Sequence, residues 1–325
     1  MLAGPQKVET VDDWPEPECG PNDVIVEMHG VGICGSDLAI YDGHHVPPDF
    51  PWVMGHEGAG EIIETGRAVA DRHIGQRVVI EPNYCCFDCP ACRSGATSAC
   101  DQRTAVGMNA PGLLAERVAV PARFTWPVSD EAATEDLVCT EPVAVARTAV
   151  HRSGVGPEDT CLVIGAGSQG LFVCMVLLAM GACPFVVEPR AERRKLAERI
   201  GAGMANADQG EFRYVFETSG ATSALRTALY RAAPMAQVML IGIGYDDSPV
   251  SSVELVRRQL LVRGSLIYDH PHDFRQAVAE VSAQRLRPSW VVAARYPLDK
   301  TADAFAATRD VPGKTWISFA PGKLR

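Results

Sequence analysis

A glycine-rich turn between a buried strand and a helix constrains the fold of this chain more than any other feature. Residues 160–164 form a run that is continuously apolar after Thr160, as in a parallel strand covered on both faces. They lead into the turn Gly165-Ala-Gly167-Ser-Gln-Gly170, and an apolar helical pattern follows at 171–180. Strand, G-x-G-x-x-G and helix in this order are typical of a dinucleotide-binding unit. Further strands expected at 185–188, 214–216, 238–241 and 261–263 make this part a doubly wound parallel α/β sheet.

The glycine turn is predicted to hold the pyrophosphate of a dinucleotide. Gly165 permits the tight turn, Gly167 lets the backbone approach the phosphates, and Gly170 lets helix and strand pack closely. Free N–H groups and the helix dipole favour anions at a helix N-terminus. Ser168 and Gln169 stand at that position, so they join the predicted cofactor-binding residues.

The second strand ends on an acid, Glu188, which could accept hydrogen bonds from the adenosine ribose hydroxyls. A carboxylate at this place repels a 2′-phosphate, which favours NAD over NADP. Arg190, Arg193 and Arg194 follow closely, and a guanidinium could hold that phosphate, so NADP stays possible. Arg193 is counted among the predicted cofactor-binding residues.

The connection after the charged helix expected at 191–200 is short. Only residues 203–213 separate that helix from the next strand. A complete βαβαβ half needs more room for a third strand and its helix. We therefore expect a trimmed crossover at this point.

The first part of the chain has a different pattern, with short β-rich runs between turns rich in Pro and Gly. Strands are expected at 24–28, 58–63 and 77–80. After about residue 288 the alternation of strand and helix patterns ends. The strand pattern of 315–319 is expected to close the first domain. The predicted domain ranges are 1–147, 148–288 and 289–325.

Four cysteines in one short loop have the spacing of a structural zinc site. The pattern is C-x2-C-x2-C-x7-C, formed by Cys86, Cys89, Cys92 and Cys100. Four thiolates close a tetrahedral shell and leave no open position for a substrate. A redox pair or free thiols are the alternatives, but a redox pair needs no third and fourth cysteine. Cys85 could be the first ligand in place of Cys86, but the spacing favours Cys86. The lobe would span about residues 85–101.

Size, charge and cysteine content narrow the classes of protein and partner. The chain has 325 residues, 47% of them hydrophobic, which suits about two domains with ordinary cores. A net charge of −10 argues against nucleic acid and anionic membranes as partners. No signal peptide and no membrane-spanning stretch is visible. Eleven cysteines in such a chain favour metal ligation or free thiols, and a cytoplasmic protein is expected.

Three further motifs carry N, S and O donors. Cys34 lies in G-I-C-G-S-D, His56 and Glu57 lie in G-H-E, and Glu141 begins E-P-V-A-V-A. Each motif is weak evidence on its own. A buried cysteine among small residues is usually core, and a glutamate before proline often starts a helix.

Together, the motifs resemble the zinc-dependent medium-chain dehydrogenase/reductase superfamily, within its polyol (sorbitol-like) and threonine dehydrogenase branch. Five motifs match in order through nearly the whole chain: G-I-C-G-S-D, G-H-E-x-x-G, the four-cysteine lobe, E-P-x-A-V-A and G-A-G-x-x-G. The resemblance implies a GroES-like β-rich catalytic domain and a Rossmann domain. It does not specify the substrate.

The resemblance also implies a catalytic zinc ion. Cys34, His56 and Glu57 fall on the ligands, and Glu141 falls on an acidic position that binds zinc directly or through water in different relatives. Ser36 falls on the hydroxyl that hydrogen-bonds the reacting oxygen, although it could simply cap a helix. Each chain would hold two zinc ions, one catalytic and one structural. Zinc lowers the pKa of a bound oxygen, so the implied reaction is hydride transfer between NAD(P) and a secondary alcohol or ketone.

One position departs from the family pattern. Many relatives place a proton-relaying histidine five residues after the first zinc ligand, where this chain has Ala39. His44 and His45 could substitute, or they could be exposed loop histidines. Without a relay, alcohol oxidation near neutral pH would be slow, and reduction could be the working direction.

Three functions follow from these observations. The leading one is an alcohol dehydrogenase that acts on a polyol, sugar, aminocyclitol or similar polar substrate. The second is a reductase of an imine or activated alkene. The third is a zinc-stabilised dinucleotide-binding protein without turnover, against which the open metal site argues. Relatives are dimers or tetramers, so the resemblance implies a homo-oligomer.

Overall fold

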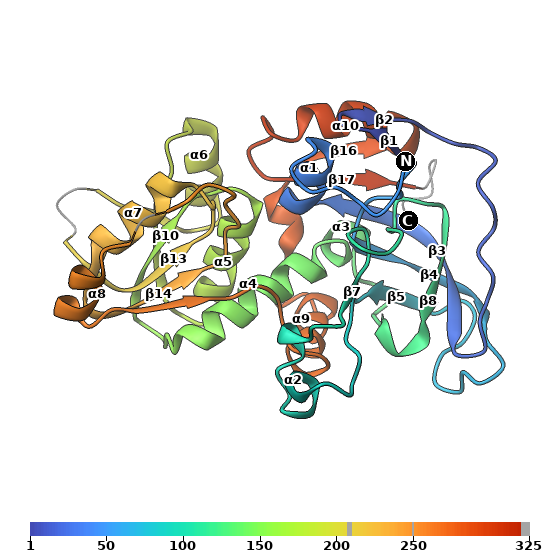
Figure 1. The fold of residues 1–325 in the computed structure, drawn as a ribbon, viewed down its shortest axis with the longest axis horizontal. Helices are drawn as coiled ribbons and strands as arrows, with labels where there is room; N and C mark the ends of the chain where they lie inside the picture. Colours follow the sequence, from blue (N-terminus) through green and yellow to red (C-terminus); the bar gives the residue numbers. More distant parts are fainter. Residues whose placement is uncertain (207–209, 249, 320–325) are drawn as a thin grey trace. The chain divides into compact units, whose positions relative to one another are not determined.

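The computed structural model describes residues 1–206, 210–248 and 250–319, and the chain forms two compact units (Figure 1). The first unit comprises Met1–Glu141 and Asp269–Arg325, and the second comprises Pro142–Tyr268. These bounds differ from the expected ranges 1–147, 148–288 and 289–325. Helix α9 (His272–Ser282), expected in the second domain, belongs to the first unit, where the residues preceding it hydrogen-bond to the cysteine lobe.

A seven-stranded sheet forms the centre of the first unit, in the order β16-β17-β3-β4-β5-β9, with β8 also paired to β3. All pairs are antiparallel except β16 with β17. The expected closing strand is confirmed, since β17 pairs with β3. The strands are β3 (Asp23–Ile33), β4 (Glu57–Thr65), β5 (Arg77–Ile80), β8 (Arg117–Pro121), β9 (Thr125–Pro127), β16 (Val292–Pro297) and β17 (Lys314–Ser318).

Short elements surround this sheet and position the candidate site. Helix α1 (Gly35–Tyr41) begins directly after β3 and packs its buried Leu38 and Ile40 against Phe305 of α10 (Thr301–Ala307) and their neighbours. The other elements are β1 (Leu2–Gly4), β2 (Lys7–Val8), β6 (Asn83–Tyr84), α2 (Pro90–Arg93), β7 (Thr104–Ala105), α3 (Thr134–Leu137), and 3-10 turns at Thr97–Ala99, Ala122–Phe124, Pro288–Val291 and Leu298–Lys300.

The second unit is the predicted doubly wound parallel sheet. Its six strands lie in the order β12-β11-β10-β13-β14-β15, and every pair is parallel. The strand order reverses at β10, which is the point where such folds bind dinucleotides. The strands are β10 (Thr160–Ile164), β11 (Cys183–Val187), β12 (Gly203–Met204), β13 (Phe212–Glu217), β14 (Ala232–Leu240) and β15 (Leu261–Gly264). The helices are α4 (Thr140–Ser153, which begins in the first unit), α5 (Ser168–Ala179), α6 (Ala191–Arg199), α7 (Thr222–Arg231) and α8 (Ser252–Arg258).

The crossover after α6 is short, as predicted. Strand β12 has two residues, and 205–211 connect it to β13. No helix occurs in the described residues of that connection; 207–209 lie outside them. Within the described part of the chain, no helix is both long and apolar enough to cross a membrane.

Candidate functional site

Cys34, His56 and Glu57 meet at one end of the first unit's sheet. Cys34 follows the last residue of β3 and caps α1, while Glu57 is the first residue of β4. The antiparallel register places Glu57 opposite Gly32, two residues before Cys34. One donor atom from each of the three side chains lies within 4.8 Å of the other two. Strand pairing therefore joins the two sequence motifs into one group.

The donors of this group fit a zinc ion. Glu57 is fully buried and pairs with Lys314 through Oε2, while Oε1 has no hydrogen-bond partner among the described residues. A buried acceptor left without a partner costs about 1–3 kcal/mol, so a buried carboxylate with an unpartnered oxygen, grouped with a thiol and an imidazole, fits a metal ligand. Three protein ligands of S, N and O type leave a fourth position open, as catalytic zinc sites require.

Asp37, to which sequence analysis gave no role, orients the group. Its carboxylate accepts hydrogen bonds from the N–H groups of Cys34 (2.9 Å) and Gly55 (3.1 Å), and its Oδ1 lies 3.3 Å from Nδ1 of His56. Burial alone would lower the pKa of His56, but the carboxylate raises that pKa well above its usual value. Because Nδ1 faces Asp37, Nε2 is left for a metal. The sequence did contain a signal for Asp37, because an acid at the third position of a helix often accepts a hydrogen bond from the backbone N–H of the capping residue.

The remaining predicted catalytic residues occupy different places. Ser36 Oγ lies 3.4 Å from Nε2 of His56. Glu141 is buried in the first turn of α4 but is not a member of the group of three, and its ligand role stays a prediction. Ala39 is buried in α1, whereas His44 and His45 are exposed in the loop that follows. A relay role for either histidine also stays a prediction.

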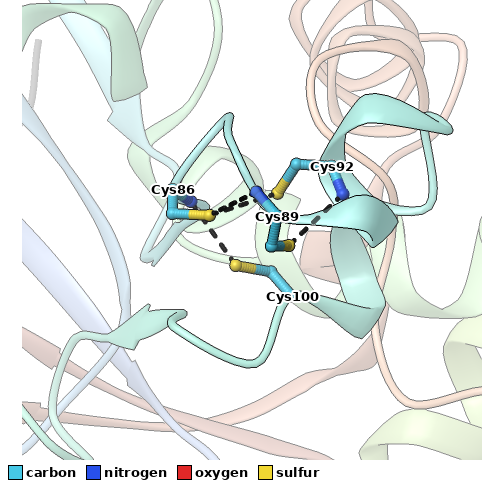
Figure 2. Close-up of side chains that lie close together, drawn as sticks. All are labelled: Cys86, Cys89, Cys92 and Cys100. Atoms are coloured by element: carbon cyan, nitrogen blue, oxygen red, sulfur yellow. Dashed lines mark hydrogen bonds between the residues drawn. The ribbon is translucent and has the colours of Figure 1, made fainter.

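The four cysteines of the lobe converge, and Figure 2 shows their sulfurs facing one another. The N–H groups of Asp88 and Cys89 donate to Sγ of Cys86 at 3.4 and 3.3 Å. These bonds stabilise a thiolate and lower the pKa of Cys86 to about 7. Cys85 is buried and lies outside the group of four. Four sulfurs within 4.8 Å of one another fit a structural zinc ion.

Residues far along the chain anchor the lobe, which sequence analysis did not foresee. The N–H of Ser98 donates to Asp269 (2.8 Å), and the N–H of His270 donates to Oγ1 of Thr97 (2.7 Å). The imidazole Nδ1 of His270 lies 2.9 Å from the buried carboxylate of Glu81. No local sequence pattern predicts such contacts, because they join segments more than a hundred residues apart.

In the second unit, the glycine turn has the predicted geometry. Gly165 has φ +95°, a conformation that a residue with Cβ rarely adopts. A Cβ on Gly170 would overlap the carbonyl oxygen of Gly165, and Gly167 is the cap that precedes Ser168 and Gln169 in α5. Nη1 of Arg193 lies 3.8 Å from the place where Gly167 would carry a Cβ. A free helix N-terminus with a guanidinium beside it fits a phosphate.

Glu188 is buried beside this turn. Its Oε2 accepts from the N–H of Ala166 (2.8 Å), and its Oε1 accepts from the N–H of Arg190 (2.9 Å). Each carboxylate oxygen retains a further lone pair that a ribose hydroxyl could use. Arg194 donates instead to the carbonyl oxygens of Glu188 and Pro189.

Comparisons with known proteins agree with both sites. Residues 20–130 match the alcohol dehydrogenase GroES-like domain family, and residues 170–283 match the zinc-binding dehydrogenase family. A relative from Agrobacterium fabrum, provisionally assigned as a D-xylulose reductase, is 31% identical over 314 residues, which cover 89% of this chain and 87% of the relative. The chain belongs to the zinc-dependent medium-chain dehydrogenase/reductase superfamily. It is therefore a zinc-containing, NAD(P)-dependent oxidoreductase acting on CH–OH groups, with the GroES-like and Rossmann folds that the sequence predicted.

Two solved structures from Escherichia coli are similar to this dehydrogenase. The alcohol dehydrogenase rspB, complexed with NADH, has a TM-score of 0.90 at 25% identity and covers 98% of both chains. Galactitol-1-phosphate dehydrogenase also has a TM-score of 0.90 at 25% identity, covering 98% of this chain and 99% of that one.

Proposed function

We propose that this protein oxidises a secondary hydroxyl of a polyol, sugar or similar polar compound, or reduces the corresponding ketone, with NAD(P) as the hydride carrier. The buried group of Cys34, His56 and Glu57 carries this proposal, because its donors fit zinc and leave one position open. Relatives named for xylulose and galactitol 1-phosphate support a polar substrate. The zinc would supply a Lewis acid for the substrate oxygen, and the nicotinamide would carry the hydride.

The protein's own side chains orient this chemistry. Asp37 holds the Nδ1 side of His56 and directs Nε2 to the metal. Ser36 Oγ, which lies 3.4 Å from Nε2, would hold or pass the proton of the substrate hydroxyl. Gly165, Gly167 and Gly170 with the start of α5 would bind the cofactor phosphates, as the geometry of the turn supports.

A reductase of an imine or activated alkene is the second candidate. Ala39, which occupies the relay position, is buried and carries no titratable group, and His44 and His45 are exposed. A reductase of this kind would consume NAD(P)H with its own substrate and show little activity with any alcohol. A non-catalytic dinucleotide-binding protein is disfavoured by the membership in an oxidoreductase superfamily.

A substrate panel tests the proposed function. The zinc-loaded protein is incubated with NAD, and separately with NADP, together with polyols, sugars, aminocyclitols, threonine and simple alcohols, with and without a chelator. Chelator-sensitive formation of reduced cofactor with a polyol or sugar is the expected result. If no compound in the panel reduces the cofactor although the cofactor binds, the reductase of an imine or activated alkene becomes the better-supported function.

Glu188→Ala is expected to narrow the preference for NAD over NADP. Loss of the carboxylate removes both an acceptor for the ribose hydroxyls and the repulsion of a 2′-phosphate. The ratio of kcat/KM with NAD to kcat/KM with NADP should therefore fall about tenfold. Because Glu188 also binds the N–H of Ala166, affinity for both cofactors should weaken. Glu198→Ala, at an exposed site on α6, is the matched control. An unchanged ratio in Glu188→Ala would rule out the ribose role.

We also propose that the protein is a homo-oligomer that associates through the edge of the second unit's sheet. Among the described residues, strand β15 pairs with β14 alone. Leu261 on this strand is 54% exposed, and Val256 on the preceding helix is 75% exposed. An exposed edge strand beside apolar side chains pairs readily with another chain. Leu261→Lys should therefore lower the mass seen in sedimentation equilibrium, whereas Ile74→Lys in the first unit should not. A mass unchanged by Leu261→Lys would contradict this interface.

A further inference from the structure

A buried lysine lies behind the candidate catalytic group. Lys314, the first residue of β17, is 1% exposed, and its Nζ forms an ion pair with Oε2 of the fully buried Glu57. The ion pair places an ammonium group next to the carboxylate of Glu57 inside the first unit.

The strand arrangement makes room for this ion pair. β17 and β4 flank β3, with Thr315 opposite Ile33 and Glu57 opposite Gly32. A Cβ on Gly32 would overlap Oε2 of Glu57 and lie 2.9 Å from Cε of Lys314. The absence of a side chain at Gly32 therefore opens the space through which the lysine reaches across β3 to the carboxylate.

The two oxygens of Glu57 consequently have different environments. Oε2 faces the ammonium of Lys314, whereas Oε1 accepts no hydrogen bond from the described residues. A carboxylate oxygen of Glu57 lies within 4.8 Å of donor atoms of both Cys34 and His56. A glutamate with no cation beside it could offer both oxygens to a metal, but with Lys314 in place only Oε1 is unengaged.

We propose that Lys314 is a positioning residue for the catalytic metal, holding Oε2 so that Glu57 offers the metal a single oxygen. This inference rests on the proposed zinc site. A thiolate from Cys34 and the carboxylates of Glu57 and Asp37 would together exceed the charge of a divalent cation by one negative charge. The ammonium of Lys314 offsets that excess, and a site without net negative charge favours an ionised substrate oxygen more strongly.

Lys314→Met tests this inference through metal binding, without reference to turnover. Removing the cation should tighten zinc binding at the catalytic group about tenfold in chelator competition, because the ammonium repels the metal and withholds one oxygen of Glu57 from it. With Co²⁺ in place of zinc, the visible absorption of that site should change, because Glu57 is free to offer both oxygens. For an active enzyme, kcat should fall about 10- to 100-fold with little change in KM. Lys314→Arg keeps the charge and should restore all three properties.

Unchanged or weaker zinc binding in Lys314→Met, together with an unchanged Co²⁺ spectrum, would overturn the inference. If that variant does not fold, the crystal structure of the zinc-loaded wild-type protein decides. One oxygen of Glu57 on the metal and the other on Lys314 supports the inference, and two oxygens on the metal overturn it. Because these readouts measure the metal alone, an inactive substrate panel with the expected metal behaviour would refute the proposed function but not the role of Lys314.

Discussion

His56→Ala is expected to remove one of two bound zinc ions and nearly all alcohol oxidation. His56 supplies the only nitrogen donor of the group, and its neighbours Cys34 and Glu57 alone leave too few ligands to hold a catalytic zinc. Lewis-acid assistance is worth several kcal/mol, so kcat/KM should fall about a thousandfold or more. Metal analysis and steady-state kinetics measure both effects.

The exposed His73 in the same unit provides the control for this experiment. His73→Ala should keep two zinc ions and full activity. Binding of NAD to His56→Ala should also persist, because the glycine turn belongs to the second unit. A His56→Ala protein with two zinc ions and activity close to that of the wild type would exclude His56 as a ligand.

Cys92→Ser is expected to remove the other zinc ion and to destabilise the first unit. The lobe has little core of its own, since helix α2 buries none of its residues and Phe87 is 44% exposed. Metal binding therefore takes the place of apolar packing, and its loss should lower the free energy of unfolding by about 4 kcal/mol or more. Thermal unfolding and zinc content measure the effect.

Cys85→Ser is the matched control, because Cys85 precedes Cys86 but lies outside the group of four sulfurs. It should keep both zinc ions, whatever its small effect on packing. Cys92→Ser should also keep the catalytic zinc at Cys34. A Cys92→Ser protein that is fully stable and binds two zinc ions would refute the structural site.

The second unit could be predicted largely from the sequence because its signals are local. A continuous apolar strand, a glycine that must adopt positive φ at Gly165, and a helix directly after it specify a βαβ unit. The short connection before β13 was visible from residue counting alone. Helix boundaries shifted by a few residues; α5, for example, begins at Ser168 and not at 171.

The sequence analysis placed the return of the chain to the first unit at residue 289, whereas in the structure the chain returns at Asp269, about twenty residues earlier. Helix α9 buries Phe274, Ala277, Val278 and Val281 on one face, which is also the pattern of a helix covering a parallel sheet. Periodicity reports that a helix has an apolar face but not which sheet or helix it packs against. The hydrogen bonds of Asp269 and His270 with the cysteine lobe associate this helix with the first unit.

For the candidate site, the sequence motifs identified the donors but not the residues that support them. Cys34, His56 and Glu57 stood out as chemical groups and through the family resemblance. Lys314 is an ordinary lysine in the sequence, and its role depends on strands β3, β4 and β17 being neighbours. Such a contact between segments more than two hundred residues apart has no local signature.

Anomalous X-ray scattering at the zinc edge, from crystals of the zinc-loaded protein, tests the central claim most directly. The account predicts two peaks per chain. One should lie about 2.0–2.3 Å from donor atoms of Cys34, His56 and Glu57, and the other about 2.3 Å from the sulfurs of the lobe. A peak in the lobe alone, with none at Cys34, His56 and Glu57, would contradict the assignment of a catalytic zinc to this group.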